Sequence, residues 1–95
     1  MLARVITADM PPERIDSAVE AARDQLSETE RHPGLRRYLL LADRRRGRII
    51  TISMWDRMTD LEAVEERARS MRREVASTAG FTEPPVEIYE VALDV

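Results

Sequence analysis

Strand-like and helix-like hydrophobic segments alternate along the chain in an order that limits the folds available to it. Strands are predicted at four short segments rich in aliphatic and β-branched side chains, residues 2–8, 35–42, 48–55 and 86–93. Between the first two strands, and again between the last two, apolar residues recur at helical spacings of three and four. The sequence therefore predicts the order β-α-β-β-α-β in one α+β domain that spans residues 1–95.

Start signals and apolar stripes define the two predicted helices. The first helix is expected to follow Pro12, and its stripe comprises Ile15, Val19, Ala22 and Leu26. The stripe of the second helix comprises Leu61, Val64, Ala68, Met71 and Val75. Thr59 and Glu62 have the spacing of a capping box, so the second helix is expected to begin at Thr59. On its outer face Glu65 is expected to pair with Arg69, four residues later.

Apolar residues occupy both faces of the predicted sheet. They are consecutive in the strand segments, as in residues 39–41, 49–50 and 91–93, instead of alternating with polar residues. Two helices cover one face of an antiparallel sheet, so the other face needs a different cover. A second copy of the chain is the simplest one, and we expect a homodimer that packs sheet against sheet.

The hairpin register decides which side chains share a face. We expect Asp43 to pair with Arg48 across a four-residue loop. One face is then mixed polar and aromatic, and carries Arg36, Tyr38, Leu40, Thr51, Ser53 and Trp55. The other face is aliphatic, and carries Leu39, Leu41, Ile50, Ile52 and Met54.

Composition excludes several classes of function. The chain has no cysteine and a single histidine, His32, so we expect no disulfide and no metal site. The net charge of −3 disfavours nucleic acid and anionic membranes as partners, and the arginines at 44–46 are expected to form a solvated hairpin tip. No apolar run approaches the ~20 residues that span a bilayer, and the N-terminus lacks the layout of a secretory signal. We expect a cytoplasmic protein.

Several of these features together resemble a known family. They are Gly34-Leu35 at the start of the second strand, Asp43 and Gly47 around the hairpin, Trp55-Asp56 ahead of Thr59-Asp60-Leu61-Glu62-Ala63, and the closing Val86-Glu87-Ile88-Tyr89-Glu90-Val91. Over essentially its whole length the chain resembles the dimeric α/β-barrel superfamily, specifically its antibiotic biosynthesis monooxygenase-like domains. The resemblance implies a ferredoxin-like two-layer sandwich with both helices on one face of the sheet. It also implies a sheet-to-sheet dimer that forms an α/β barrel, and a pocket between sheet and helices lined by Trp55.

Members of this superfamily differ in activity, so the resemblance leaves two functions open. It implies a cofactor-independent monooxygenase that acts on a small aromatic, quinol or polyketide-like substrate. The alternative is a non-catalytic dimer that binds a small ligand or serves as an accessory protein. Haem-degrading members use an asparagine in the first strand and a histidine on the second helix, and this chain has no asparagine and no histidine in that helical segment. We therefore expect no cofactor.

Five side chains on the mixed face are candidates for binding an aromatic substrate. Trp55 can stack on a planar ligand, although a core role for this ring is about as common. Tyr38, Ser53 and Thr51 can orient a hydroxyl or carbonyl group, or can be satisfied locally. Arg36 can hold an anionic oxygen, or can reach solvent at the barrel mouth. The sequence singles out no catalytic residue, and His32 is expected to be an exposed turn residue.

Overall fold

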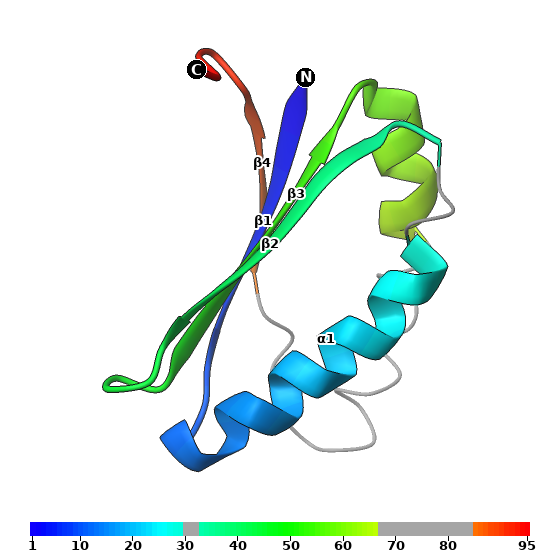
Figure 1. The fold of residues 1–95 in the computed structure, drawn as a ribbon. Coiled ribbons are helices and arrows are strands. Elements are labelled where there is room, and N and C mark those ends of the chain that lie inside the picture. The colour runs from blue at the N-terminus through cyan, green and yellow to red at the C-terminus, as the bar shows by residue number, and fades with distance from the viewer. Residues whose placement is uncertain (30–32, 67–84) are drawn as a thin grey trace.

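A four-stranded antiparallel sheet forms one layer of the computed structural model, which describes residues 1–29, 33–66 and 85–95 (Figure 1). Its strands lie in the order β2-β3-β1-β4. Their bounds are β1 (Leu2–Asp9), β2 (Leu35–Asp43), β3 (Arg48–Trp55) and β4 (Val86–Glu90). A short 3-10 helix, η1 (Pro12–Arg14), leads into α1 (Ile15–Thr29), and a second helix is described for residues 58–66.

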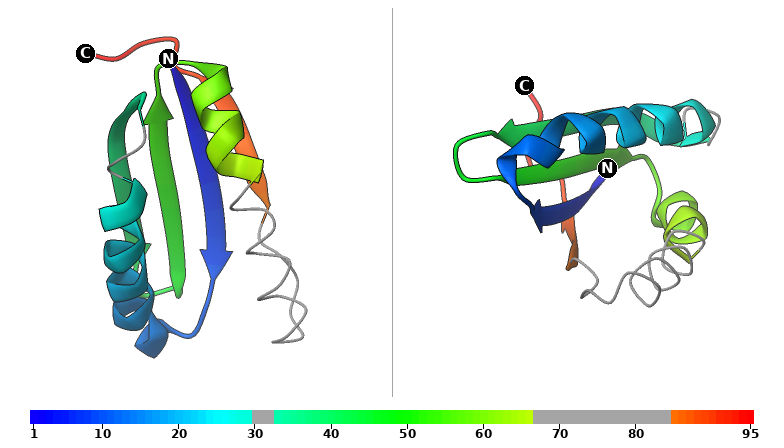
Figure 2. Two further views of the ribbon diagram at one scale, coloured as in Figure 1. Left: turned by 90° about the vertical axis from the view of Figure 1, so that its right-hand side faces the viewer. Right: turned by 90° about the horizontal axis from the view of Figure 1, so that it is seen from below.

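Both helices lie on the same face of the sheet. Seen from that side, α1 runs over β2, whereas the helix of residues 58–66 lies over β1 and β4 (Figure 2). This arrangement confirms the predicted α+β class and its ferredoxin-like two-layer order. Among the described residues, no helix is long and apolar enough to cross a membrane.

The predicted hairpin register is confirmed over most of its length. Asp43 pairs with Arg48, and the pairing continues without interruption to Tyr38 opposite Ser53. The tight turn depends on Gly47, which has a φ of +75° and whose N–H donates to the Asp43 carbonyl at 3.0 Å. Its carbonyl in turn accepts from the N–H of Met10 at 2.8 Å, which fixes the hairpin against the end of β1.

The predicted pairing of Arg36 with Trp55 is wrong. Leu35 is the residue that pairs with Trp55, and the next pair is Arg37 with Met54, so Arg36 is the extra residue of a bulge. Gly34, at a φ of +89°, turns the chain into the strand, and its carbonyl accepts from the N–H of Asp56 at 2.9 Å. Without the bulge, the alternation of side chains along β2 would have placed Arg36 on the helix-covered face with Tyr38. The bulge interrupts that alternation at Arg36.

Several element ends differ from their predicted positions, and β1 and β2 each extend one residue further, to Asp9 and Asp43. The second helix begins at residue 58, where the N–H of Leu61 donates to the carbonyl of Arg57, so Thr59 lies in the first turn and is not the cap. Strand β4 ends at Glu90 instead of residue 93 because Glu90 pairs with Leu2, the first residue of β1. Beyond it the N–H of Val91 donates to the carbonyl of Met1 at 2.9 Å.

The buried core lies between the helices and the sheet and includes side chains near both ends of the sheet. Ile15 at the start of α1, Trp55 at the end of β3 and Leu61 of the second helix are its fully buried side chains among the described residues. The opposite face of the sheet is open. It carries Val5, Leu39, Leu41, Ile50, Ile52 and Met54, as the register predicted for the β2 and β3 residues.

Candidate functional site

A row of side chains crosses the helix-covered face at the middle of the sheet. Register pairs place Tyr38 of β2, Ser53 of β3, Arg4 of β1 and Ile88 of β4 next to one another in that order. Because direct partners in an antiparallel sheet point to the same side, these four residues share one face. The row brings together an aromatic hydroxyl, an aliphatic hydroxyl and a guanidinium group.

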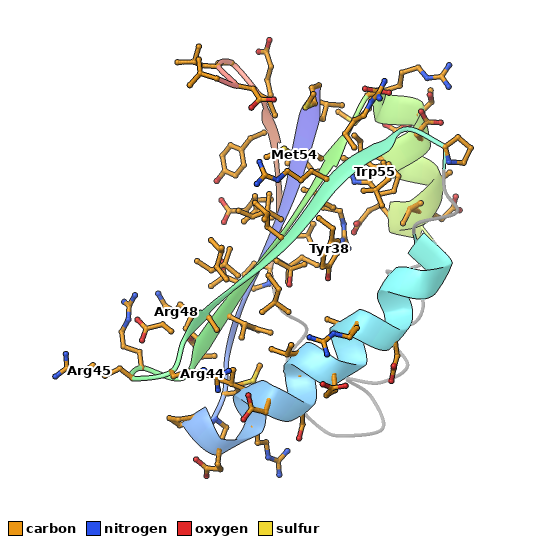
Figure 3. All side chains as sticks on the ribbon, in the orientation of Figure 1. Tyr38, Arg44, Arg45, Arg48, Met54 and Trp55 are labelled. Atoms are coloured by element: carbon orange, nitrogen blue, oxygen red, sulfur yellow. The ribbon has the colours of Figure 1, made fainter. Side chains whose placement is uncertain are left out.

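Trp55 and Ser53 form the buried end of the site. The indole Nε1 donates to the Ser53 hydroxyl at 3.0 Å, and the two residues are 1% and 3% exposed. They lie two positions apart on β3, so both side chains point toward the helices, as Figure 3 shows for Trp55. The structure thus encloses the indole and satisfies its polar group within the protein.

A nearly buried ion pair joins the sheet to the second helix next to this hydrogen bond. The Nε of Arg4 donates to a carboxylate oxygen of Glu65, and the two side chains are 11% and 9% exposed. The expected placement of Glu65 on the outer face is therefore wrong. It lies one turn after Leu61 on the inner face, and Arg69, its expected partner, is outside the described residues.

Tyr38 and Thr51 continue the polar strip away from Trp55. Burial raises the pKa of the Tyr38 hydroxyl above its ordinary value, while a hydrogen bond with Thr51 and the positive charge of Arg4 act to lower it. Tyr38 lies on the side of the sheet that faces the helices (Figure 3). The charge of Arg4 therefore acts on a phenolic oxygen in the same row.

Side chains at the centre of this covered face keep partial exposure. Tyr38, Leu40, Thr51 and Ile6 are all half-buried, although they belong to β2, β3 and β1 on the side that the helices cover. In a closed two-layer sandwich, central positions of this kind would be fully buried. The described turns of the two helices thus do not cover the middle of the sheet as completely as they cover Trp55 and Ser53.

Arg36 lies outside this cluster. Its Nε donates to both carboxylate oxygens of Asp56 at 2.7 and 2.8 Å, and its side chain is 63% exposed. That contact raises the pKa of Arg36 and lowers the pKa of Asp56. Of the five predicted site residues, the structure brings together Trp55, Ser53, Tyr38 and Thr51, and it places Arg36 at the surface.

Solved structures with the same arrangement place the fold in a known group. A Deinococcus radiodurans protein assigned to the antibiotic biosynthesis monooxygenases superposes with a TM-score of 0.77 at 14% identity, over 100% of this chain and 96% of that one. A further antibiotic biosynthesis monooxygenase gives a TM-score of 0.67 at 20% identity, over 98% of this chain and 100% of that one. The chain has the antibiotic biosynthesis monooxygenase fold.

The same fold includes proteins of a different activity. The heme-degrading protein MhuD of Mycobacterium tuberculosis, with two hemes bound in its active site, gives a TM-score of 0.67 at 18% identity, over 100% of this chain and 99% of that one. No protein-family model matches the present sequence. No curated protein is significantly similar to it. The fold is therefore shared by proteins named antibiotic biosynthesis monooxygenases and by a heme-degrading protein.

Two residues of the site were missed by sequence reasoning. Arg4 is a charged residue on the helix-facing side of an otherwise apolar strand, and Glu65 lies four positions after Leu61 on the apolar stripe of the second helix. Each interrupts an apolar face, which is the signal that could have identified them as a buried pair. Arg44 and Arg46 lie apart from the site, where they pair with Asp16 of α1 and with Asp43 of the hairpin. His32 lies outside the described residues.

Metal-binding groups are absent from the described residues. No cluster of three or more histidine, cysteine, aspartate or glutamate side chains there could hold a metal ion. The chemistry that the described site offers is therefore that of hydroxyl groups, one guanidinium group and one carboxylate beside an apolar wall.

Proposed function

We propose that this protein binds a small planar aromatic substrate between its sheet and its helices and oxidises it with dioxygen without a cofactor. The observation that carries the proposal is the incomplete cover over Tyr38, Thr51, Leu40 and Ile6, beside the enclosed Trp55 and Ser53. A ligand in this position would contact an apolar wall on one side and hydroxyl groups on the other, which is the usual composition of a small-molecule site.

The substrate class follows from the electron balance of a cofactor-free reaction. A phenol, quinol or polyketide-like substrate loses a proton, and the resulting anion passes an electron to dioxygen. In an anthrone-type phenol, one oxygen atom then enters the substrate, so that its CH2 group becomes a carbonyl, and the other leaves as water with the two hydrogens of that group. All electrons come from the substrate, and the protein supplies orientation and stabilisation of the anion.

Heme is the competing ligand, because neighbours of the same fold bind it. The donor residues of this chain do not fit the expected heme site. The described turns of the second helix carry no histidine, the chain has no asparagine or cysteine, and Arg4 lies on β1 with Glu65 opposite it. We therefore assign no step to heme iron.

Non-catalytic binding of the same aromatic ligand is the second candidate function. It is favoured by Tyr38, whose pKa is raised by burial and which is thus a poor base near neutral pH. The described part of the site also holds no imidazole that could take a proton. A binding or accessory protein would use the same face without consuming oxygen.

We also propose that the open face of the sheet mates with a second copy to form a homodimer. No helix of the described residues lies above the aliphatic side chains on this face, and Leu41 is 47% exposed. Tyr89 of β4, on the same face, is 51% exposed. Contiguous apolar surface of this kind favours association, and a self-complementary face favours two-fold symmetry.

Oxygen uptake tests the catalytic proposal. A panel of aromatic quinols and anthrone-type substrates is added to the protein in a closed oxygen-electrode cell, and the uptake rate is corrected for autoxidation. We expect substrate-dependent uptake that is reduced in Tyr38→Phe and preserved in Tyr89→Phe, which removes an exposed phenolic hydroxyl. Saturable binding without oxygen uptake from any substrate would instead support the non-catalytic function.

A further inference from the structure

The charge that would stabilise a substrate anion is on Arg4 and not on Arg36. Sequence reasoning gave that role to Arg36, but the bulge between Leu35 and Arg37 places Arg36 at the surface, paired with Asp56. Arg4 instead lies under the helix of residues 58–66, in direct register with Ser53. It thus provides a nearly buried cation on the covered face.

The guanidinium group of Arg4 has more donors than its hydrogen bond to Glu65 uses. It carries five N–H donors, and the bond to Glu65 takes the one on Nε. No buried side-chain nitrogen or oxygen among the described residues lacks a hydrogen-bond partner, so each terminal nitrogen of Arg4 is either hydrogen-bonded or in contact with solvent. Glu65 holds the guanidinium group in place through Nε, and the two terminal nitrogens of that planar group can bind an anionic oxygen.

The enclosure of the pair makes it different from the surface ion pairs of this protein. Arg36–Asp56, Arg46–Asp43 and Arg48–Asp9 each include a side chain that is more than 60% exposed. Water screens charges at such positions, whereas it screens the less exposed charges of Arg4 and Glu65 more weakly. The effect reaches Tyr38 in the same row, because the positive charge of Arg4 favours the ionised form of that phenol.

We propose that Arg4 is the oxyanion-stabilising residue of the ligand site, and that the site selects aromatic ligands in their phenolate form. This inference rests on the proposed function, since it places the ligand on the same covered face. The phenolic proton passes to solvent, Arg4 remains protonated, and Glu65 acts as a positioning residue that fixes the guanidinium group. The acidic oxygen of the ligand lies toward Arg4, and its ring lies over Leu40 and Ile6.

Ionisation of a bound chromophoric phenol tests the proposal without any turnover. The probe is 4-nitrophenol, whose phenolate is yellow, and 4-nitroanisole is its non-ionisable counterpart. Absorbance titrations in the free and protein-saturated states give the pKa of the probe in each state. For the wild-type protein we expect the bound pKa to be lower by about one unit, so that the phenolate binds about tenfold more tightly than the neutral phenol.

Variants separate the role of the charge from a role in folding. Arg4→Gln with Glu65→Gln removes both charges but keeps two groups that can hydrogen-bond, and it leaves the net charge unchanged. We expect this double variant to lose the tenfold phenolate preference while still binding 4-nitroanisole. Arg4→Lys should retain part of the preference. The matched control is Arg48→Gln with Asp9→Asn, an exposed pair between β3 and β1, and it should keep the full preference.

The outcomes distinguish failure of this inference from failure of the proposed function. If the folded double variant keeps the wild-type preference, or if the wild-type protein binds both probes without favouring the phenolate, Arg4 is not the oxyanion-stabilising residue, and the aromatic site stands. If neither probe binds to the wild-type protein, both the inference and the aromatic-ligand function are wrong. Thermal melting and tryptophan emission establish that each variant is folded before titration.

Discussion

The indole N–H of Trp55 donates to the hydroxyl of Ser53, two residues earlier on the same strand, at the buried end of the helix-covered face. Strand alternation places both side chains under the helices, and this hydrogen bond lets a tryptophan be enclosed there without an unsatisfied donor. The same alternation places Thr51 next along this face, where the described turns of the helices leave the side chain partly exposed. One strand therefore contributes both a sealed wall and a partly open polar surface.

Removal of the Ser53 hydroxyl should destabilise the protein through Trp55. Ser53→Ala leaves the buried indole N–H without its partner, so we expect a loss of about 1–3 kcal/mol in the free energy of unfolding. Urea denaturation measures this loss. Ser17→Ala, at an exposed position of α1, should change stability by less than about 0.5 kcal/mol. In a Trp55→Phe background the cost of Ser53→Ala should shrink, and an undiminished cost would mean that the hydrogen bond is not the cause.

The Arg4–Glu65 pair should show strong energetic coupling. Arg4→Gln alone leaves a nearly buried carboxylate without its cation, and we expect it to cost about 3 kcal/mol or more. Addition of Glu65→Gln should recover part of that loss, which gives a coupling energy of at least about 1 kcal/mol in a double-mutant cycle. The exposed pair Arg48–Asp9 is the control, with expected coupling below about 1 kcal/mol. Equal coupling energies in the two pairs would contradict the expectation that the less exposed pair, Arg4–Glu65, is coupled more strongly.

Tyr38 should titrate at higher pH in the folded protein than in the unfolded chain. Burial favours its neutral hydroxyl, so the folded-state pKa lies above the ordinary value of about 10. Its contribution to stability is complete below the unfolded pKa and is lost as pH rises through the folded pKa. Ultraviolet absorbance of Tyr89→Phe, which retains Tyr38 as its one tyrosine, should show a midpoint above that of the same protein in urea. Coincident midpoints would show that Tyr38 is not in a desolvated position.

The open sheet face should fail to assemble when a charge is placed at its centre. Ile52 pairs with Val5 on one side and Leu39 on the other, so Ile52→Asp introduces a carboxylate amid aliphatic neighbours. We expect the wild-type protein to sediment as a dimer and the variant to be monomeric or unfolded. Ala21→Asp, at an exposed position of α1, should remain dimeric. A folded, dimeric Ile52→Asp would mean that this face is not the interface.

Sequence patterns were sufficient for the element order, the strand positions and most of the hairpin register. Residues 48–55 form β3 as predicted, because β-branched side chains and Gly47 define both the strand and the turn before it. The register correctly placed Tyr38, Ser53 and Thr51 on the covered face. The polar and aromatic part of the site followed directly from that alternation.

The predictions that failed depend on contacts between segments far apart in sequence. The bulge at Arg36 does not alter the hydrophobic pattern, and it became visible only with the pairing of Leu35 and Arg37 to β3. Glu65 reads as a solvent-facing residue because its buried partner, Arg4, is 61 positions earlier. The spacing from Leu61 could have placed Glu65 on the inner face of the helix, but a local helix pattern does not identify a partner on β1, so the charged half of the site was not predicted.

Fluorescence of Trp55 tests the location of the ligand site most directly, because it is the single tryptophan of the chain and lies at the closed end of the covered face. Planar phenols and quinols are titrated into the wild-type protein, with free N-acetyltryptophanamide as the control for optical absorption by the ligand. The proposal predicts a saturable change in Trp55 emission with at least one aromatic ligand. A change no larger than that of the control, for every ligand tried, would contradict an aromatic-ligand site between the sheet and the helices.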